Sequence, residues 1–583
     1  MIKLCAAVAA MLLSCSTPPN RNPTVSTETK PKPAGIEGVW GGTIELASNG
    51  PPPRTVVVTS QGAVPTASID GVGFALENKD GALSGRTKDG QELRLRRATQ
   101  RGRLVGHYVQ PPSSPWMSYP SATPVVLTES DGGFRGTVEP FADRLRLYLA
   151  IRRAKDGRGT IAFIREPGRN LGRRFGTMTV RQSGDRYDLF DGSGHAQMSA
   201  VLAGDTLSLT IARLEQTVAL TRRGRTNAPH YYPRASGVYS YSVPTAKGDG
   251  WKVGTLTSQG FDREAVVRLI ETIATSEPTS WASPAVHSLL VARRGTLVVE
   301  EYFSGTTALE PHDTRSAGKS FGTTLAGLAD KRGLLEADAK LAPYLGRPPT
   351  DPRKAAITLE HAMTMTTGLE CDDNDNDNSE GNEGRMQSQR DQPNWYQYIW
   401  SLPMVRRPGE RAVYCSGGIN LVGAAVAGAT KQWIPDFFAT ALAEPLGIEH
   451  YHFNLMPNGQ GYLGGGVRLR ARDFAKLGQL YLQGGAWNGV QLLNPDWVMT
   501  ATRAHASINE PNDYGYGWWL LSYDLGGEKV SGYYASGNGG QFIIVVPKLE
   551  LVVAIMAGNY GNYFTWRSFR DYLAKDIAAA IVR

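Results

Sequence analysis

With 583 residues, the chain is too long for a single ordinary hydrophobic core, so two or three domains are expected. Hydrophobic residues make up 41% of the chain and charged residues 20%, a balance typical of globular proteins. The formal net charge of +8 comes mainly from Arg residues that alternate with apolar residues within 94–106, 144–174 and 213–234. This spacing is typical of the solvent-facing side of strands and argues against nucleic-acid binding.

The first fifteen residues have the pattern of an export signal. Lys3 precedes an apolar stretch over residues 4–13 that is too short to span a bilayer as a mature helix. The stretch runs into Leu-Leu-Ser-Cys at residues 12–15, which resembles the lipobox of bacterial lipoproteins. The resemblance implies a lipid on Cys15, and Ser16 beside it implies transfer to the periplasmic face of the outer membrane. An ordinary cleaved signal peptide with an incidental Cys15 is the alternative.

Two further segments precede the part of the chain that carries helical patterns. Residues 16–35 are rich in Pro, Thr and Lys and are predicted to form a flexible tether. From residue 36 to 235, short apolar runs are cut by Gly, Asp and Asn, and they predict strands at 55–59, 93–95, 145–151, 176–180 and 206–211. We therefore predict an all-β region of one or two small barrels or sandwiches. Substrate recruitment, partner docking and spacing are all open as its function.

Residues 255–583 combine helical and strand patterns. Helices are predicted over residues 261–275, 316–333, 420–429, 472–483 and 566–582. A hairpin is predicted over residues 287–303, and two strands over 542–546 and 551–556. Strands at both ends with helices between them predict an α/β (α+β) domain, in which one antiparallel sheet from the two termini is packed by helices.

A candidate nucleophile lies at the start of the second of these helices. Ser316 is followed three residues later by Lys319, and residues three apart share one face of a helix. The Lys319 amine can therefore reach the Ser316 hydroxyl, and the amides of the helix N-terminus favour negative charge there. The pair predicts a nucleophile with a base beside it. Taken alone, a helix-capping Ser with a solvent-facing Lys is the alternative.

Two later stretches could complete a site. Tyr414 lies in a Gly-rich turn before a helix, where a nearby Lys would lower its pKa towards the range of a general base. A buried Tyr hydrogen-bonded through its hydroxyl is the alternative. Small residues at 535–540 would let the backbone approach a ligand and offer amides to an oxyanion, although a plain hairpin turn is equally consistent.

Together, and in this order, the three stretches resemble the serine β-lactamase and penicillin-binding-protein superfamily, especially its class C-like hydrolases and esterases and the relatives of 6-aminohexanoate-dimer hydrolase. The resemblance covers roughly residues 255–583. It implies that Ser316 is the nucleophile, that Lys319 keeps it deprotonated and that Tyr414 shuttles its proton. It also implies an oxyanion hole from the amides of Ser316 and Asn538, and no metal or organic cofactor.

The chain departs from the superfamily pattern at two motifs. In place of Tyr-x-Asn it has Tyr414-Cys415-Ser416, and Ser416 lacks the reach of an amide. In place of Lys-Thr-Gly it has Ala535-Ser536-Gly537, which offers no cation to a substrate carboxylate.

These departures favour hydrolysis of a neutral small-molecule or peptide-like ester or amide through an acyl-enzyme. A cell-wall D-peptidase or β-lactamase is the first rival. The second is a binding lipoprotein that has lost catalysis, in which the β region carries the binding function and the hydrolase fold is a scaffold. Neither the natural substrate nor the oligomeric state follows from the sequence.

Two features remain within the same domain. Export favours a disulfide between Cys371 and Cys415, which would close a loop of about 44 residues (415 minus 371) and contribute about 4 kcal/mol. Two buried free thiols are the alternative. Residues 372–378 carry alternating acidic oxygens but lack the Gly and the closing Glu of a calcium loop. A solvated loop beside the cleft is predicted there, with calcium binding as the alternative.

Overall fold

The computed structural model describes residues 35–45, 53–59, 64–79, 81–98, 100–112, 119–142, 144–165, 176–223, 233–277, 279–346, 351–373, 389–509 and 512–582. The predicted signal segment with Cys15, residues 16–34 of the predicted tether and residues 374–378 of the acidic loop lie outside these ranges. Within them, no helix is both long enough and apolar enough to cross a membrane.

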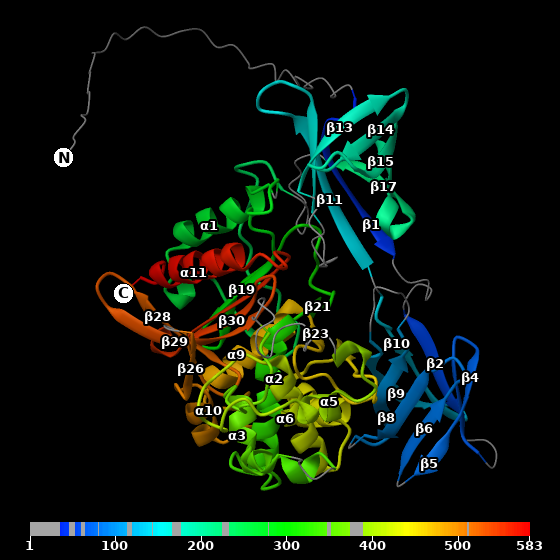
Figure 1. Ribbon diagram of the computed structural model, residues 1–583, viewed down its shortest axis with the longest axis vertical. Coiled ribbons are helices and arrows are strands. Elements are labelled where there is room, and N and C mark those ends of the chain that lie inside the picture. The colour runs from blue at the N-terminus through cyan, green and yellow to red at the C-terminus, as the bar shows by residue number, and fades with distance from the viewer. Residues whose placement is uncertain are drawn as a thin grey trace.

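The N-terminal region is all-β, as predicted, and begins with a closed barrel (Figure 1). The barrel closes because its last strand returns to pair with its first, with Arg223 opposite Val39. Its strands follow the order β1 (Gly38–Glu45), β11 (Arg144–Arg153), β12 (Thr160–Arg165), β13 (Thr177–Ser183), β14 (Arg186–Phe190), β15 (Ala196–Ala203), β16 (Thr206–Ile211) and β17 (Gln216–Arg223).

A second sheet is inserted in the chain between the first two barrel strands. Its strands are β2 (Arg54–Thr59), β3 (Thr66–Ile69), β4 (Val72–Ala75), β5 (Glu77–Lys79), β6 (Ala82–Arg86), β7 (Glu92–Arg97), β8 (Arg103–Gln110), β9 (Ser121–Ser130) and β10 (Gly133–Val138). Ala122 of β9 pairs with Phe453 of β22 (Tyr451–Asn454), and β22 leads through β23 (Val467–Leu469) to β21 (His312–Asp313). The inserted sheet is therefore continuous with strands of the C-terminal domain.

The C-terminal domain is built on a nine-stranded sheet in the order β18-β20-β19-β31-β30-β29-β28-β27-β26. The predicted antiparallel arrangement is confirmed, apart from a short parallel pair of β18 with β20 at one edge. The strands are β18 (Lys252–Val253), β19 (Val286–Arg293), β20 (Thr296–Tyr302), β26 (Ala506–Asn509), β27 (Asn512–Tyr514), β28 (Trp519–Asp524), β29 (Lys529–Gly537), β30 (Gln541–Val546) and β31 (Leu551–Ala557). Leu289 of β19 pairs with Ile555 of β31, so the two ends of the domain meet in the sheet centre, as expected.

Helices cover both faces of this sheet, because alternate side chains along a central strand point to opposite sides. On β31, Val553 belongs to the core under α1 (Arg263–Thr275) and α11 (Tyr563–Ala579), whereas Val552 and Ala554 belong to the core on the other side. That second layer contains α2 (Gly318–Lys331), α3 (Leu359–Met363), α5 (Trp395–Ser401), α6 (Ser416–Thr430), α7 (Ile434–Phe438), α8 (Glu444–Leu446), α9 (Ala471–Leu482) and α10 (Pro495–Ala501) (Figure 1). A small hairpin of β24 (Ala486–Trp487) and β25 (Val490–Gln491) follows α9.

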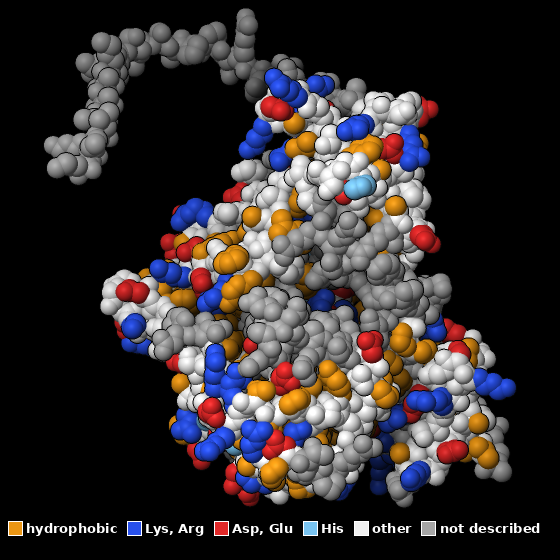
Figure 2. Space-filling model, viewed as in Figure 1, with side chains coloured by type: hydrophobic (Ala, Val, Ile, Leu, Met, Phe, Trp, Pro, Cys, Tyr) orange, Lys and Arg blue, Asp and Glu red, His pale blue; other side chains and the backbone are white. Residues whose placement is uncertain are grey.

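The surface carries charges of both signs. On the face drawn in Figure 2, Lys and Arg side chains are interspersed with Asp and Glu over both the β region and the helical layer. The alternating Arg residues of the barrel and inserted sheet include ion pairs such as Arg144 with Glu45 and Arg186 with Asp188.

Candidate active site

Ser316 lies in a 3-10 turn, Arg315–Ala317, that leads directly into α2. The residue before it, Arg315, has a φ of 50°, in the left-handed region where a residue with a side chain is strained. Asp313 holds this conformation, because its carboxylate accepts from the Arg315 amide at 3.0 Å and pairs with the Arg315 guanidinium at 3.1 Å. Thr314 donates to the Val467 carbonyl at 2.6 Å, which ties the turn to β23. The serine is thus presented by a fixed backbone.

Lys319 is buried one turn further along and is 1% exposed. Its Nζ donates to Ser316 Oγ and to the Gly464 carbonyl, each at 2.8 Å. Burial lowers the pKa of Lys319 to about 8, while the charge of Asp373 acts to raise it. A useful fraction of the amine is therefore neutral near physiological pH and able to accept the Ser316 proton. The predicted contact between the two side chains is confirmed.

Tyr414 comes from the turn before α6 and completes this cluster. Its ring stacks on Trp519 with 5.5 Å between ring centroids, and Lys319 Nζ lies 4.9 Å from the Tyr414 ring centroid. Burial raises the Tyr414 pKa, although a hydrogen bond with Ser316 opposes the rise. The predicted lowering of this pKa is wrong, because burial penalises the phenolate more than its neighbours favour it. Tyr414 is therefore a neutral phenol that can donate its proton, and its oxygen can also accept a hydrogen bond.

The end of β29 lies close to the turn that carries Ser316, at Gly537. A Cβ on Gly537 would lie 2.3 Å from the Thr314 carbonyl oxygen, so only glycine lets the strand come this close. Ser536 precedes it half-buried, and Asn538 follows at an exposed position. The Asn538 side chain accepts from the Gly561 amide at 2.8 Å, which fixes the turn. Gly537 thus lies against the segment that carries Ser316, with Asn538 next to it in the chain. The predicted approach of this backbone to a ligand stays a prediction.

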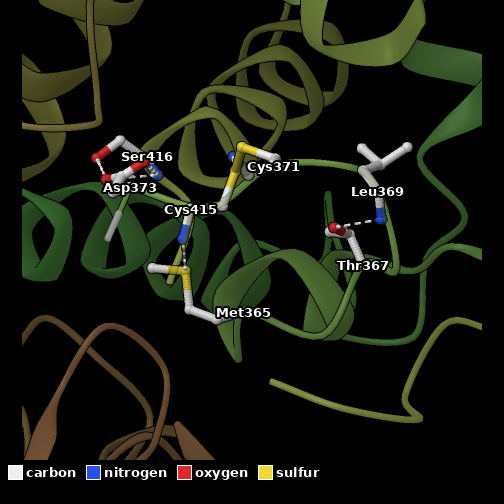
Figure 3. The surroundings of a disulfide bond; sticks show 8 residues. Met365, Thr367, Leu369, Cys371, Asp373, Cys415 and Ser416 are labelled. Carbon is white, nitrogen blue, oxygen red and sulfur yellow. Dashed lines mark hydrogen bonds between the residues drawn. A yellow bond between two sulfur atoms is a disulfide. The ribbon is translucent and has the colours of Figure 1, made fainter. Parts of the chain in front are cut away.

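Ser416 has a partner that the sequence analysis did not identify. Its amide donates to the two carboxylate oxygens of Asp373 at 3.0 and 3.1 Å, and its hydroxyl donates to the same carboxylate (Figure 3). Asp373 is partly buried, so the predicted solvated loop is wrong for this residue. In the part of the chain that the structure describes, no three or more His, Cys, Asp and Glu side chains are grouped to hold a metal ion.

The predicted disulfide is formed between Cys371 and Cys415, with 5.5 Å between the Cα atoms. It joins the segment that carries Asp373 to the residue between Tyr414 and Ser416 (Figure 3). The sequence contained a signal for the missed carboxylate. Asp373 follows Cys371 by two residues and Ser416 follows Cys415 by one, so pairing the cysteines already places Asp373 near Ser416.

Tyr119 of the N-terminal region packs against aromatic residues of the C-terminal domain close to the candidate site. Tyr119, just before β9, packs edge-on against Trp395 with ring centroids 5.2 Å apart, and 6.4 Å from Tyr462. Tyr462 is two residues before Gly464, whose carbonyl accepts from Lys319 Nζ. No candidate site residue is predicted in the β region from its sequence, whereas the structure places Tyr119 next to residues that neighbour the cluster of Ser316, Lys319 and Tyr414.

About half of the chain is similar to a known family and to several solved structures. Residues 282–568 match the family model described as Beta-lactamase. A protein described as a 6-aminohexanoate-dimer hydrolase from Bacillus anthracis has 20% identity and a TM-score of 0.43, over 51% of this chain and 79% of its own. A penicillin binding protein from Bacillus halodurans has 17% identity and a TM-score of 0.41, over 50% of this chain and 96% of its own. A family VIII carboxylesterase has 15% identity and a TM-score of 0.42, over 57% and 98%.

Proposed function

Because residues 282–568 form a domain of the serine β-lactamase and penicillin-binding-protein superfamily, we propose that the protein is a serine hydrolase that cleaves an ester or amide bond through an acyl-enzyme on Ser316. The observation that carries the proposal is the 2.8 Å contact between Lys319 Nζ and Ser316 Oγ in a buried setting. A serine activated by an adjacent base is the arrangement that nucleophilic catalysis requires.

The proposed reaction begins when Ser316 Oγ attacks the substrate carbonyl and its proton passes to neutral Lys319. The carbonyl oxygen becomes an oxyanion that accepts hydrogen bonds from the amides of Ser316 and Asn538. Tyr414 gives its phenolic proton to the leaving oxygen or nitrogen as the bond to the carbonyl carbon breaks, and it regains a proton from Lys319. Water then attacks the acyl-Ser316 carbonyl, gives up a proton through the same groups and releases the acid.

The electrostatics near the site favour a neutral substrate. Residues 535–537 offer no cation, and Ala535 is fully buried. The neighbouring Arg315 is engaged in its ion pair with Asp313. A substrate carboxylate would have to leave water without a cation from this strand, which costs several kcal/mol in a buried setting (about 3–5 when a partner is missing). An ester or amide is therefore better supported than a penicillin or a peptide that ends in a carboxylate.

The intact arrangement of Ser316, Lys319 and Tyr414 supports an enzyme over a lapsed binding lipoprotein. The place of the protein in the cell is proposed from its sequence: a lipid on Cys15 would anchor it at the periplasmic face of the outer membrane. The disulfide between Cys371 and Cys415 supports an oxidising compartment such as the periplasm.

Hydrolysis of a short p-nitrophenyl ester tests the proposal. Ser316→Ala should lower kcat by roughly 1,000-fold or more, because the residue that forms the covalent intermediate is gone. Ser320→Ala is the matched control, since that hydroxyl donates to the Gly517 carbonyl and not to Lys319. Ser316→Ala protein that keeps most of its activity would reject the mechanism.

A further inference from the structure

The carboxylate of Asp373 is held by hydrogen bonds at the start of α6. Both of its oxygens accept hydrogen bonds from Ser416, through the amide and the hydroxyl. A carboxyl group that only accepts is the ionised form. Ser416 is also the first residue of the 15-residue helix α6, so the carboxylate lies at the positive end of the helix dipole, which stabilises its charge.

The backbone around Asp373 is equally constrained. Its amide donates to the Tyr414 carbonyl at 2.8 Å, while its side chain holds Ser416, so it contacts both neighbours of Cys415. The disulfide from Cys371 to Cys415 closes the same short span (Figure 3). Asp373 is therefore held in a fixed place relative to Tyr414.

Asp373 is also the charge that acts on Lys319. Burial of Lys319 disfavours its ammonium form, and among the described residues Asp373 is the one whose charge opposes that effect. The interaction is mutual, because Lys319 favours the ionised form of Asp373. The other groups around the amine are neutral: the Ser316 hydroxyl, the Gly464 carbonyl and the Tyr414 phenol.

Two further charges lie close to this arrangement. Burial raises the pKa of Asp373 and the charge of Asp372 adds to this rise, whereas Lys319 and the hydrogen bonds from Ser416 oppose it. Arg315 precedes Ser316 in the chain. Arg315 is paired with Asp313, which removes it as a partner for Asp373. The titration of Lys319 therefore depends chiefly on its own burial and on Asp373.

We propose that Asp373 is a positioning residue for the reaction: held by Ser416 and the Cys371–Cys415 disulfide, it supplies a fixed negative charge that stabilises Lys319 after the amine takes the Ser316 proton. This chain has Tyr-x-Ser at residues 414–416 in place of Tyr-x-Asn. Ser416 donates hydrogen bonds to Asp373, whose charge acts on Lys319. The proposal rests on the proposed hydrolase function, because it assigns Asp373 a part in the same proton transfer.

The test is the pH dependence of kcat/KM for a neutral p-nitrophenyl ester. Asp373→Asn keeps the size of the side chain and removes the charge, so the Lys319 ammonium should lose stabilisation and the acid limb should move to lower pH by about 1 unit. Asp373→Glu should restore a charge and bring the limb back towards its wild-type position. Asp372→Asn, which removes the same charge one residue away, should move the limb much less.

A residue with only a structural role would lower the plateau of the profile without moving its acid limb. An unmoved limb in Asp373→Asn, or an equal movement in Asp372→Asn, would therefore overturn the inference. Cooperative thermal unfolding checks that each variant is folded. Should Asp373→Asn not fold, Asp373→Ser, which keeps a small acceptor for the Ser416 amide, carries the same expectation.

The two proposals fail in different ways. If wild-type protein shows no turnover that depends on Ser316, the hydrolase proposal itself fails. If turnover depends on Ser316 and shows an acid limb that Asp373→Asn leaves in place, the hydrolase proposal stands and only the role of Asp373 is rejected.

Discussion

Lys319 donates to Ser316 at 2.8 Å from a position that is almost completely buried. Burial makes the amine a weaker base than a free lysine, with a pKa of about 8, and so makes its neutral form available. The contact links a local helix pattern to the proposed function, because the spacing that places the two side chains on one face also brings the proposed base to the proposed nucleophile.

The first prediction concerns pH. Since Lys319 must be neutral to accept the Ser316 proton, kcat/KM should rise with pH through a midpoint near the Lys319 pKa of about 8 and be lost below it. The measurement is kcat/KM for an ester between about pH 6 and pH 10, corrected for spontaneous hydrolysis. A profile that is already flat below neutral pH would contradict the assignment of Lys319 as the base.

The second prediction concerns Tyr414. Tyr414→Phe keeps the ring that stacks on Trp519 but removes the hydroxyl, so kcat should fall by about 100-fold or more while the fold is retained. The acid limb set by Lys319 should remain. Unchanged kcat in this variant would show that the leaving group is protonated by another route.

The third prediction concerns the close approach of β29. Gly537→Ala would place a Cβ 2.3 Å from the Thr314 carbonyl, so the strand must move away from the nucleophile turn. Because the Asn538 amide moves with it, kcat should fall roughly 100-fold, as when one oxyanion-hole donor is lost. Gly192→Ala is the matched control, since a Cβ there meets nothing within 4 Å. Equal activity of the two variants would contradict this role for the strand.

The fourth prediction concerns the disulfide. Cys371→Ser should lower the free energy of unfolding by about 4 kcal/mol in the chain-entropy account, because the loop it closes spans 44 residues. Urea unfolding measures the change, and reduced wild-type protein should behave like the variant. Stability that is the same in reduced and oxidised protein would contradict a contribution from this bond.

The fifth prediction concerns specificity. Since residues 535–537 offer no cation, kcat/KM for a neutral ester should exceed that for nitrocefin, whose carboxylate would go unpaired. Both substrates can be compared with the same wild-type preparation, with Ser316→Ala as the blank. Faster turnover of nitrocefin would favour the β-lactamase alternative.

The sequence predicts the parts of the site that depend on local spacing. The helix that carries Ser316 and Lys319, the strand β30 that follows Gly537 and the pairing of Cys371 with Cys415 all follow from periodicity, residue type or cysteine count. Even here the bounds differ: α6 begins at Ser416, four residues before the predicted start, because Cys415 caps it by accepting from the Gly418 amide.

The features that the sequence did not predict depend on contacts between distant residues. Asp373 and Ser416 are 43 residues apart, and an acidic, Asn-rich segment gives no local sign that one carboxylate turns inward. The rise of the Tyr414 pKa depends on burial, and a Gly-rich turn in the sequence does not show how deeply the Tyr side chain is buried. The insertion of β2 to β10 between barrel strands β1 and β11 is a matter of strand pairing, and strand patterns do not specify partners.

The proposed function requires Ser316 to form a covalent acyl-enzyme. Intact-protein and peptide mass spectrometry after incubation with a fluorophosphonate probe tests it most directly. We predict one adduct per chain, located on the peptide that contains Ser316 and absent from Ser316→Ala. An unmodified wild-type protein, or a label that persists in Ser316→Ala, would contradict it.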